Sequence, residues 1–126
     1  MNRNIVATTL ALMLVAPTMA NAVEASLTIN LGKAASQTDV TPYDCGTETP
    51  LVVTYINANP NFLAILPVAE EPQELVFASV ISASGARYAS GQWVWWSKGS
   101  DASLYDTTLG EDAEAVLTCT EIHDTP

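Results

Sequence analysis

Hydrophobic and polar residues alternate in short runs along most of the chain. An alternation of this kind places the apolar side chains on one face of a β-strand. Turn-forming residues separate the runs at short intervals, most densely at residues 57–61, and no stretch has a sustained helical period. The pattern predicts strands at residues 40–45, 51–56, 62–68, 75–82, 86–89, 92–97, 102–106 and 113–122.

Seven or eight short antiparallel strands predict an all-β fold. The two cysteines, Cys45 and Cys119, lie in the first and the last of these strands, and we expect them to form one disulfide. A covalent link between the terminal strands favours a closed barrel, because closure removes the exposed edges of a sheet. We therefore predict a small antiparallel β-barrel closed by one disulfide, with a β-sandwich as the alternative.

The first residues have the features of an export signal. Arg3 precedes an apolar run at residues 5–15, which is too short for a membrane-spanning helix, and Ala20-Asn21-Ala22 offers a cleavage site. We expect a cleaved signal peptide at residues 1–22, a flexible lead-in at 23–41 and the barrel domain at 42–123. A weak alternation at residues 26–31 leaves an added edge strand open. Because no cysteine lies near the cleavage site, the expected product is soluble and periplasmic, without a lipid or membrane anchor.

The formal net charge of −10 argues against a nucleic acid or an anionic lipid as partner, since both require clustered basic residues. Signs of enzyme chemistry are few. The single histidine, His123, lies close to the C-terminus, and no metal-ligand spacing or phosphate-binding loop is present. We therefore expect no enzyme, no metal and no cofactor, although the many carboxylates leave a glycan hydrolase formally open.

Residues 82–104 carry most of the distinctive side chains. A hairpin turn is expected at Ser90-Gly91, and two further turns, Ser84-Gly85 and Lys98-Gly99, flank the hairpin. Because the hairpin folds the chain back, Ser84 and Lys98 are expected at one end of the sheet. A hydroxyl and an ammonium group placed together there would suit the carboxylates of a partner.

The three tryptophans of this stretch divide between two faces of a strand. Trp93 and Trp95 share one face, and Val94 and Trp96 share the other. One pair must fill the core, and the other is expected to be exposed or packed under a loop. Exposed tryptophans would favour an alternative function, a small barrel that binds an apolar or glycan ligand in its lumen or on its surface.

The same stretch resembles the c-type lysozyme inhibitors of Gram-negative bacteria, the MliC/PliC proteins. The matching elements are Ser84-Gly85-Ala86-Arg87-Tyr88, Tyr88-Ala89-Ser90-Gly91 and Trp96-Ser97-Lys98-Gly99. The resemblance implies an eight-stranded barrel that inserts both loops into the active-site cleft of a basic c-type lysozyme and so protects peptidoglycan. It also implies that Ser84 and Lys98 contact the two catalytic carboxylates. The positions expected to shape the loops are Gly85, Arg87, Tyr88, Gly91, Trp96 and Gly99. A homodimer is left open.

Overall fold

A computed structural model describes residues 26–32 and 35–124 of the chain. The chain divides into two compact units, Met1–Asn30 and Leu31–Pro126. The described part of the first unit, residues 26–30, contains no strand, so the edge strand left open at 26–31 is not formed. The expected signal peptide at residues 1–22 lies outside the described residues.

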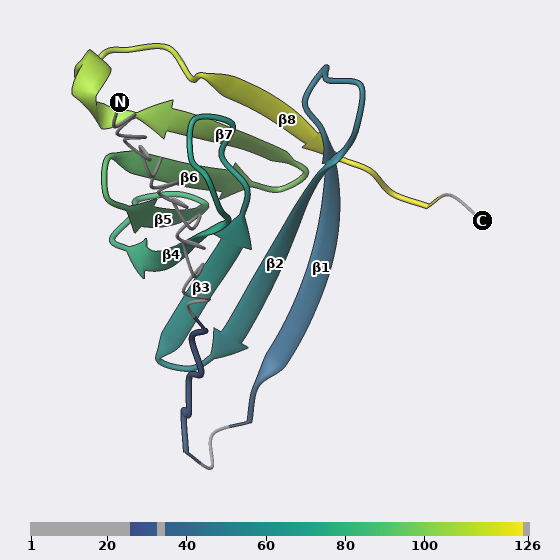
Figure 1. Cartoon of the computed structure of the whole chain (residues 1–126), viewed down its shortest axis with the longest axis vertical. Coiled ribbons are helices and arrows are strands. Elements are labelled where there is room, and N and C mark those ends of the chain that lie inside the picture. Colours follow the sequence, from purple (N-terminus) through teal and green to yellow (C-terminus); the bar gives the residue numbers. More distant parts are fainter. Residues whose placement is uncertain (1–25, 33–34, 125–126) are drawn as a thin grey trace, which may run out of the picture. The chain divides into compact units, whose positions relative to one another are not determined.

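The second unit contains eight strands and one short 3₁₀ helix. They are β1 (Gln37–Asp44), β2 (Leu51–Ala58), β3 (Asn61–Leu66), β4 (Leu75–Val80), β5 (Ala86–Ser90), β6 (Trp93–Lys98), β7 (Asp101–Asp106), η1 (Thr107–Leu109) and β8 (Leu117–Glu121). Each strand pairs antiparallel with the next, and β1 also pairs with β8 (Figure 1). The predicted closed barrel is therefore confirmed, and the sandwich alternative is wrong.

The barrel is closed by the pairing of β1 with β8, the pair of strands that shares the fewest paired residues. Between β1 and β8 only Tyr43 pairs with Glu121 and Asp44 with Thr120. Cys45 and Cys119 continue this ladder by one step, and their disulfide joins Cα atoms that are 4.1 Å apart. The predicted disulfide is thus confirmed, and it reinforces the seam where the barrel has the fewest backbone pairs.

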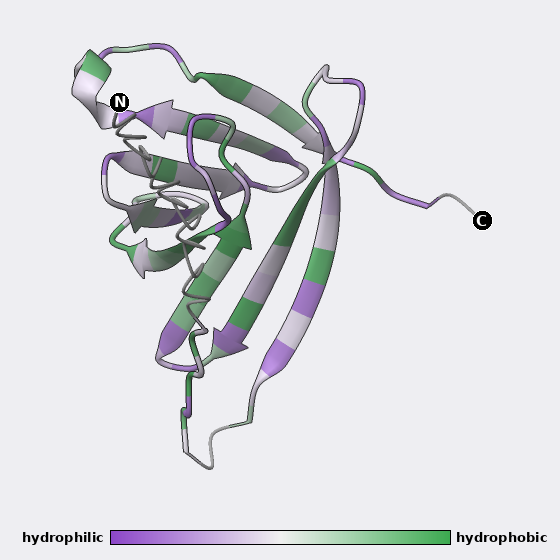
Figure 2. Ribbon diagram, in the orientation of Figure 1, coloured by the Kyte–Doolittle hydropathy of each residue, from purple (hydrophilic) through white to green (hydrophobic). Residues whose placement is uncertain are grey.

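Alternating side chains point into the barrel and fill it. Hydrophobic residues predominate along β3, whereas β1 is largely hydrophilic (Figure 2). The largest fully buried side chains are Trp95, Phe77, Leu66, Leu104, Val53 and Cys119. A barrel of eight strands has an interior just wide enough for side chains to fill. The lumen therefore offers no support for the alternative in which an apolar ligand binds inside the barrel.

The polar groups of the aromatic core are paired with one another. Trp95 Nε1 donates to the hydroxyl of Tyr55 at 2.8 Å, and the hydroxyls of Tyr43 and Tyr55 are hydrogen-bonded at 2.9 Å. At the indole of Trp93, Nε1 donates to Glu71 Oε1 at 2.8 Å, which ties the loop between β3 and β4 to the barrel. These bonds offset much of the cost of burying polar atoms.

The core tyrosines make the stability of the barrel sensitive to alkaline pH. Burial raises the pKa of Tyr43 and of Tyr88, and the neighbouring Tyr55 raises both further. An unfolded tyrosine loses its proton near pH 10, whereas the pKa of each of these two is higher in the folded state. The unfolded state therefore binds fewer protons above pH 10, and the free energy of unfolding falls there by at most about 1.4 kcal/mol per pH unit for each tyrosine.

Urea unfolding at pH 8, 9.5 and 11 measures this effect. We expect a flat stability from pH 8 to 9.5 and a decline at pH 11. The variant Tyr43→Phe removes one titrating group, so its stability should decline less steeply than that of the wild type. Equal slopes for the two proteins would contradict the assignment.

Two strands begin three or more residues away from their predicted starts. β1 begins at Gln37, inside the segment expected to be a flexible lead-in, and its first residues pair with β2 from Asn57 to Val53. This part of β1 has only one neighbouring strand in the barrel and is largely exposed, so it needs no apolar alternation. The last strand begins at Leu117 and not at residue 113, because pairing with β7 reaches only Leu117 and residues 113–116 are irregular.

Candidate functional site

The turns around β5, β6 and β7 bring the two predicted loops to one end of the barrel. The hairpin between β5 and β6 turns at Gly91 and Gln92, one residue beyond the predicted turn. Ala86 at the start of β5 pairs with Ser97, next to Lys98 at the end of β6. The connection that contains Ser84 and Gly85 therefore lies beside the turn that contains Lys98, as the hairpin prediction required.

Gly85 lies in contact with the end of β6. Its φ angle is +64°, and a Cβ atom built on it would be 2.3 Å from the carbonyl oxygen of Ser97 and 2.6 Å from Lys98 Cγ. No real Cβ atom approaches a backbone oxygen so closely. Glycine is consequently required here both by its backbone conformation and by the space available. The contact packs the first loop onto the stem of the Lys98 side chain.

Trp96 joins the two loops from the outer face of β6. Its indole Nε1 donates to the carbonyl oxygen of Ser84 at 2.9 Å, while the ammonium nitrogen of Lys98 lies 3.9 Å from the centroid of its ring. The first contact fixes the Ser84 loop, and the second is a cation–π interaction with the Lys98 side chain. Ser82 Oγ donates a further hydrogen bond to the same Ser84 carbonyl. The side chains of Ser84 and Lys98 remain exposed.

The positive charge of the described chain is concentrated at this tryptophan. Arg87 pairs with Trp96 across β5 and β6, and its Cζ atom lies 5.0 Å from the centroid of the Trp96 ring. Arg87 and Lys98 are the only lysine or arginine residues within the described ranges. Among the described residues neither of them forms an ion pair with a carboxylate. The Lys98 charge is therefore not neutralised within this part of the protein.

The remaining predicted positions divide between the core and the turns. Tyr88 is buried, and its ring centroid lies 5.8 Å from that of Tyr55. Gly91 and Gly99 have φ angles of +55° and +58° in two-residue turns, a conformation that glycine adopts without strain. Trp93 and Trp95 form the core pair of tryptophans. Val94 and Trp96 lie on the opposite face of β6, where Val94 is buried and Trp96 is half-buried. The packing predicted for the tryptophans is confirmed for Trp93 and Trp95.

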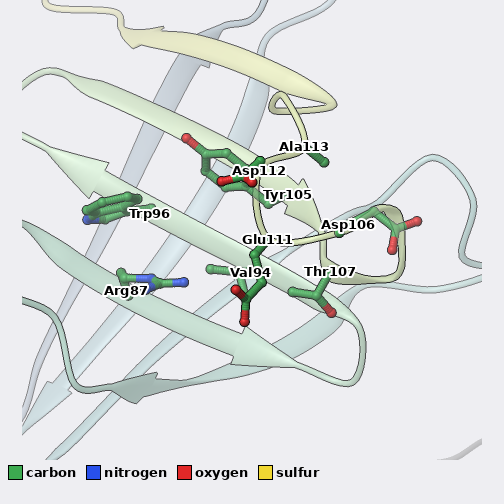
Figure 3. Close-up of a pocket in the computed structure, with 10 residues that line it drawn as sticks. Arg87, Val94, Trp96, Tyr105, Asp106, Thr107, Glu111, Asp112 and Ala113 are labelled. Atoms are coloured by element: carbon green, nitrogen blue, oxygen red, sulfur yellow. The ribbon is translucent and has the colours of Figure 1, made fainter.

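A pocket on the outer face of the barrel was missed by the sequence analysis. It has a volume of about 790 Å³ and is lined by Arg87, Val94, Trp96, Tyr105, Asp106, Thr107, Gly110, Glu111, Asp112 and Ala113 (Figure 3). Its wall is the segment that includes η1, which was predicted to be a turn followed directly by a strand. The sequence Asp106-Thr107-Thr108 was an available signal, because Asp106 caps η1 by accepting from the backbone nitrogen of Thr108.

Nothing in the described residues resembles a metal centre. No group of three or more histidine, cysteine, aspartate or glutamate side chains is arranged to hold a metal ion in that part of the chain. His123 is exposed and lies 3.6 Å from the Glu121 carboxylate.

The fold and the loops define a class of protein: small antiparallel β-barrels, closed by a disulfide, in which two adjoining turns present a serine and a lysine. The family described as membrane-bound lysozyme inhibitor of c-type lysozyme (MliC) matches residues 43–112. This match covers more than half of the chain, and the chain therefore belongs to that family.

Individual relatives agree with this assignment. The membrane-bound lysozyme inhibitor of C-type lysozyme from Pseudomonas aeruginosa is 41% identical over 71% of this chain and 70% of its own length. Proteins of the same name from Cupriavidus necator and Escherichia coli are 37% and 41% identical, with 58% and 59% of their lengths covered. The crystal structure of Pseudomonas aeruginosa MliC in complex with hen egg white lysozyme has a TM-score of 0.64 and 35% identity, and covers 81% of this chain and 100% of that one.

The expectation of a soluble, non-lipidated periplasmic product is contradicted by these comparisons. The family and all three relatives are named membrane-bound. The expectation was based on the absence of a cysteine near the cleavage site, and that absence does not determine how a protein is held at a membrane. Within the described residues, no helix is long and apolar enough to cross a bilayer.

Proposed function

We propose that this protein inhibits c-type lysozyme by inserting the Ser84-Gly85 and Lys98-Gly99 loops into the active-site cleft of the enzyme. The observation that carries the proposal is the exposed Lys98 side chain, held between Trp96 and Gly85 and not ion-paired among the described residues. The Pseudomonas aeruginosa relative, crystallised in complex with hen egg white lysozyme, supports the choice of partner.

The chemistry of the target explains why these two side chains suit it. A glycosidase of this type uses one protonated and one ionised carboxyl group on either side of the scissile bond. In the proposed complex the Lys98 ammonium forms an ion pair with the ionised carboxylate, and the Ser84 hydroxyl forms a hydrogen bond that a substrate hydroxyl would otherwise make. The enzyme is blocked because its catalytic groups are occupied, and the inhibitor is not consumed.

The contacts within the site reduce the entropic cost of this insertion. The Ser84 loop is held by the bond from Trp96, and the Lys98 stem by the ring of Trp96 and the backbone of Gly85. Groups that are ordered before binding lose less conformational freedom on association. The barrel thus presents both donors in one arrangement in the free protein.

The charge of the whole chain supports the same partner. A formal charge of −10 attracts a strongly basic protein over distances of about 10 Å, the screening length at moderate salt. The positive charge of Lys98 then enters an acidic cleft, while the negative charge of the rest of the chain attracts the basic surface of the partner. Inhibition of lysozyme in this way would protect peptidoglycan from cleavage.

A lysozyme activity assay titrated with the purified protein tests the proposal directly. We expect the rate at which hen egg white lysozyme clears a peptidoglycan suspension to fall to zero at about one equivalent of inhibitor. The protein alone should clear no peptidoglycan. Full lysozyme activity in the presence of micromolar protein would overturn the proposed function.

A further inference from the structure

We propose that the outer pocket in Figure 3 binds a lysine or arginine side chain of the protein partner, as a second contact beside the two loops. The proposal rests on the proposed function for the identity of the partner. It assigns the pocket to one kind of guest, a cationic side chain that projects from a basic protein surface.

Strands and a loop build the pocket from opposite sides. Arg87, Val94, Trp96 and Tyr105 project from the outer face of β5, β6 and β7, and the segment after η1 brings Glu111 and Asp112 over them (Figure 3).

Backbone hydrogen bonds hold the loop segment at both of its ends. Thr107 donates from its backbone nitrogen to Gln92 O at 2.9 Å, and Val116 donates to Leu104 O at 2.8 Å. The volume of about 790 Å³ is ample for a long side chain together with the backbone that carries it. Because the segment is fixed at both ends, the pocket is already present in the free protein.

The charges that line the pocket favour a cationic guest. Glu111 and Asp112 are exposed, and neither makes a hydrogen bond or ion pair with another described residue. Figure 3 shows the Glu111 carboxylate and the Arg87 guanidinium directed into the same space, yet no ion pair joins them. Arg87 stacks on Trp96, and its Nε atom is buried without a hydrogen-bond partner. The two carboxylates are therefore available to a cation from outside.

An aromatic surface completes the site. The ring of Tyr105 lies 6.4 Å from that of Trp96 at an angle of 49°, and no cation of the described chain stacks on Tyr105. A guanidinium or ammonium group can lie over such a ring while the carboxylates bind its N–H groups. An anionic guest would meet Glu111 and Asp112, and a purely apolar guest would remove their hydration without replacing it.

The pocket is close enough to the loops to be covered by the same partner. Trp96 and Tyr105 also line a smaller cavity of about 90 Å³ whose other walls include Lys98 and Asp101. The same tryptophan thus contacts the Lys98 side chain on one side and borders the pocket on the other. A protein that receives Lys98 in its active site therefore extends over the pocket, and a basic partner has the side chain that the pocket requires.

The first experiment compares two double variants with equal changes of charge. Glu111→Gln with Asp112→Asn removes both pocket carboxylates, and Glu48→Gln with Glu74→Gln removes two exposed carboxylates from other loops. We expect the pocket variant to bind hen egg white lysozyme about tenfold more weakly, mainly through faster dissociation, and the control variant to change less than twofold. Equal weakening of both variants, or no weakening of either, would overturn the proposal.

The second experiment does not depend on lysozyme. Nα-acetyl-arginine amide is titrated into the full protein, with the neutral isostere Nα-acetyl-citrulline amide as control, and backbone amide shifts are followed by NMR. We expect the arginine probe to shift the amides of residues 110–113 in the wild type but not in the pocket variant. Equal shifts from both probes, or none, would overturn the pocket assignment. If the arginine shifts are seen and lysozyme is not inhibited, only the proposed function fails.

Discussion

Replacing Lys98 with alanine should weaken the inhibition of c-type lysozyme by about 2–5 kcal/mol. In the proposed complex the ammonium group is buried against an ionised carboxylate, so its removal leaves that carboxylate desolvated and unpaired. The barrel itself should keep its stability, since Lys98 is exposed and forms no ion pair in the described part of the chain. The inhibition constant is measured for both proteins at the same salt concentration.

Two further variants separate charge from packing. Lys98→Met keeps a long stem beside Trp96 and Gly85 but lacks the ammonium group, and we expect it to inhibit as poorly as Lys98→Ala. Ser84→Ala removes one neutral hydrogen bond and should cost about 1 kcal/mol. If Lys98→Ala and Ser84→Ala both inhibit as well as the wild type, the assignment of these two residues is wrong.

Most of the barrel could be predicted because its strands and turns are encoded by residues that lie close together in the sequence. The alternation of apolar residues identified the strands, and turn residues such as Gly91 and Gly99 identified the hairpins. The first half of β1 could not be found in this way. Its polar residues are held by backbone pairing with β2 and by contacts such as Asn57 Nδ2 donating to Asp39 at 3.3 Å, and these depend on a distant part of the chain.

The candidate site was predictable to the extent that one hairpin determines it. Because β5 and β6 fold back on each other, Ser84 and Lys98 had to emerge at one end, and the register from Ala86 to Ser97 places them there. Trp96 was expected to shape the loops only from the family resemblance, since a tryptophan in a strand does not by itself indicate a bond to the Ser84 carbonyl. The pocket depends on the path that residues 107–116 take over the outer face of the barrel. Hydrophobic periodicity does not predict the path of such an irregular segment.

The variant Gly85→Ala tests whether the close contact between the two loops is necessary for inhibition. A left-handed backbone conformation costs an alanine about 1–2 kcal/mol, and forcing a methyl group into packed surroundings adds about 1–3 kcal/mol. Relief of the clash with the Ser97 carbonyl and Lys98 Cγ requires one loop to move away from the other. We expect both a loss of stability in urea and a loss of inhibition of tenfold or more.

Gly91 provides the matched control, because it differs from Gly85 in the space around it and not in its backbone. Its φ angle of +55° is close to the +64° of Gly85, but nothing lies within 4 Å of an added Cβ atom. Gly91→Ala should therefore incur only the conformational cost, with a lower stability and unchanged inhibition. If both variants lose stability equally and both inhibit like the wild type, the contact between the loops does not position Lys98. Loss of inhibition in Gly85→Ala alone would instead mean that the position of Lys98 relative to Ser84, and not merely its charge, determines how tightly the cleft is closed.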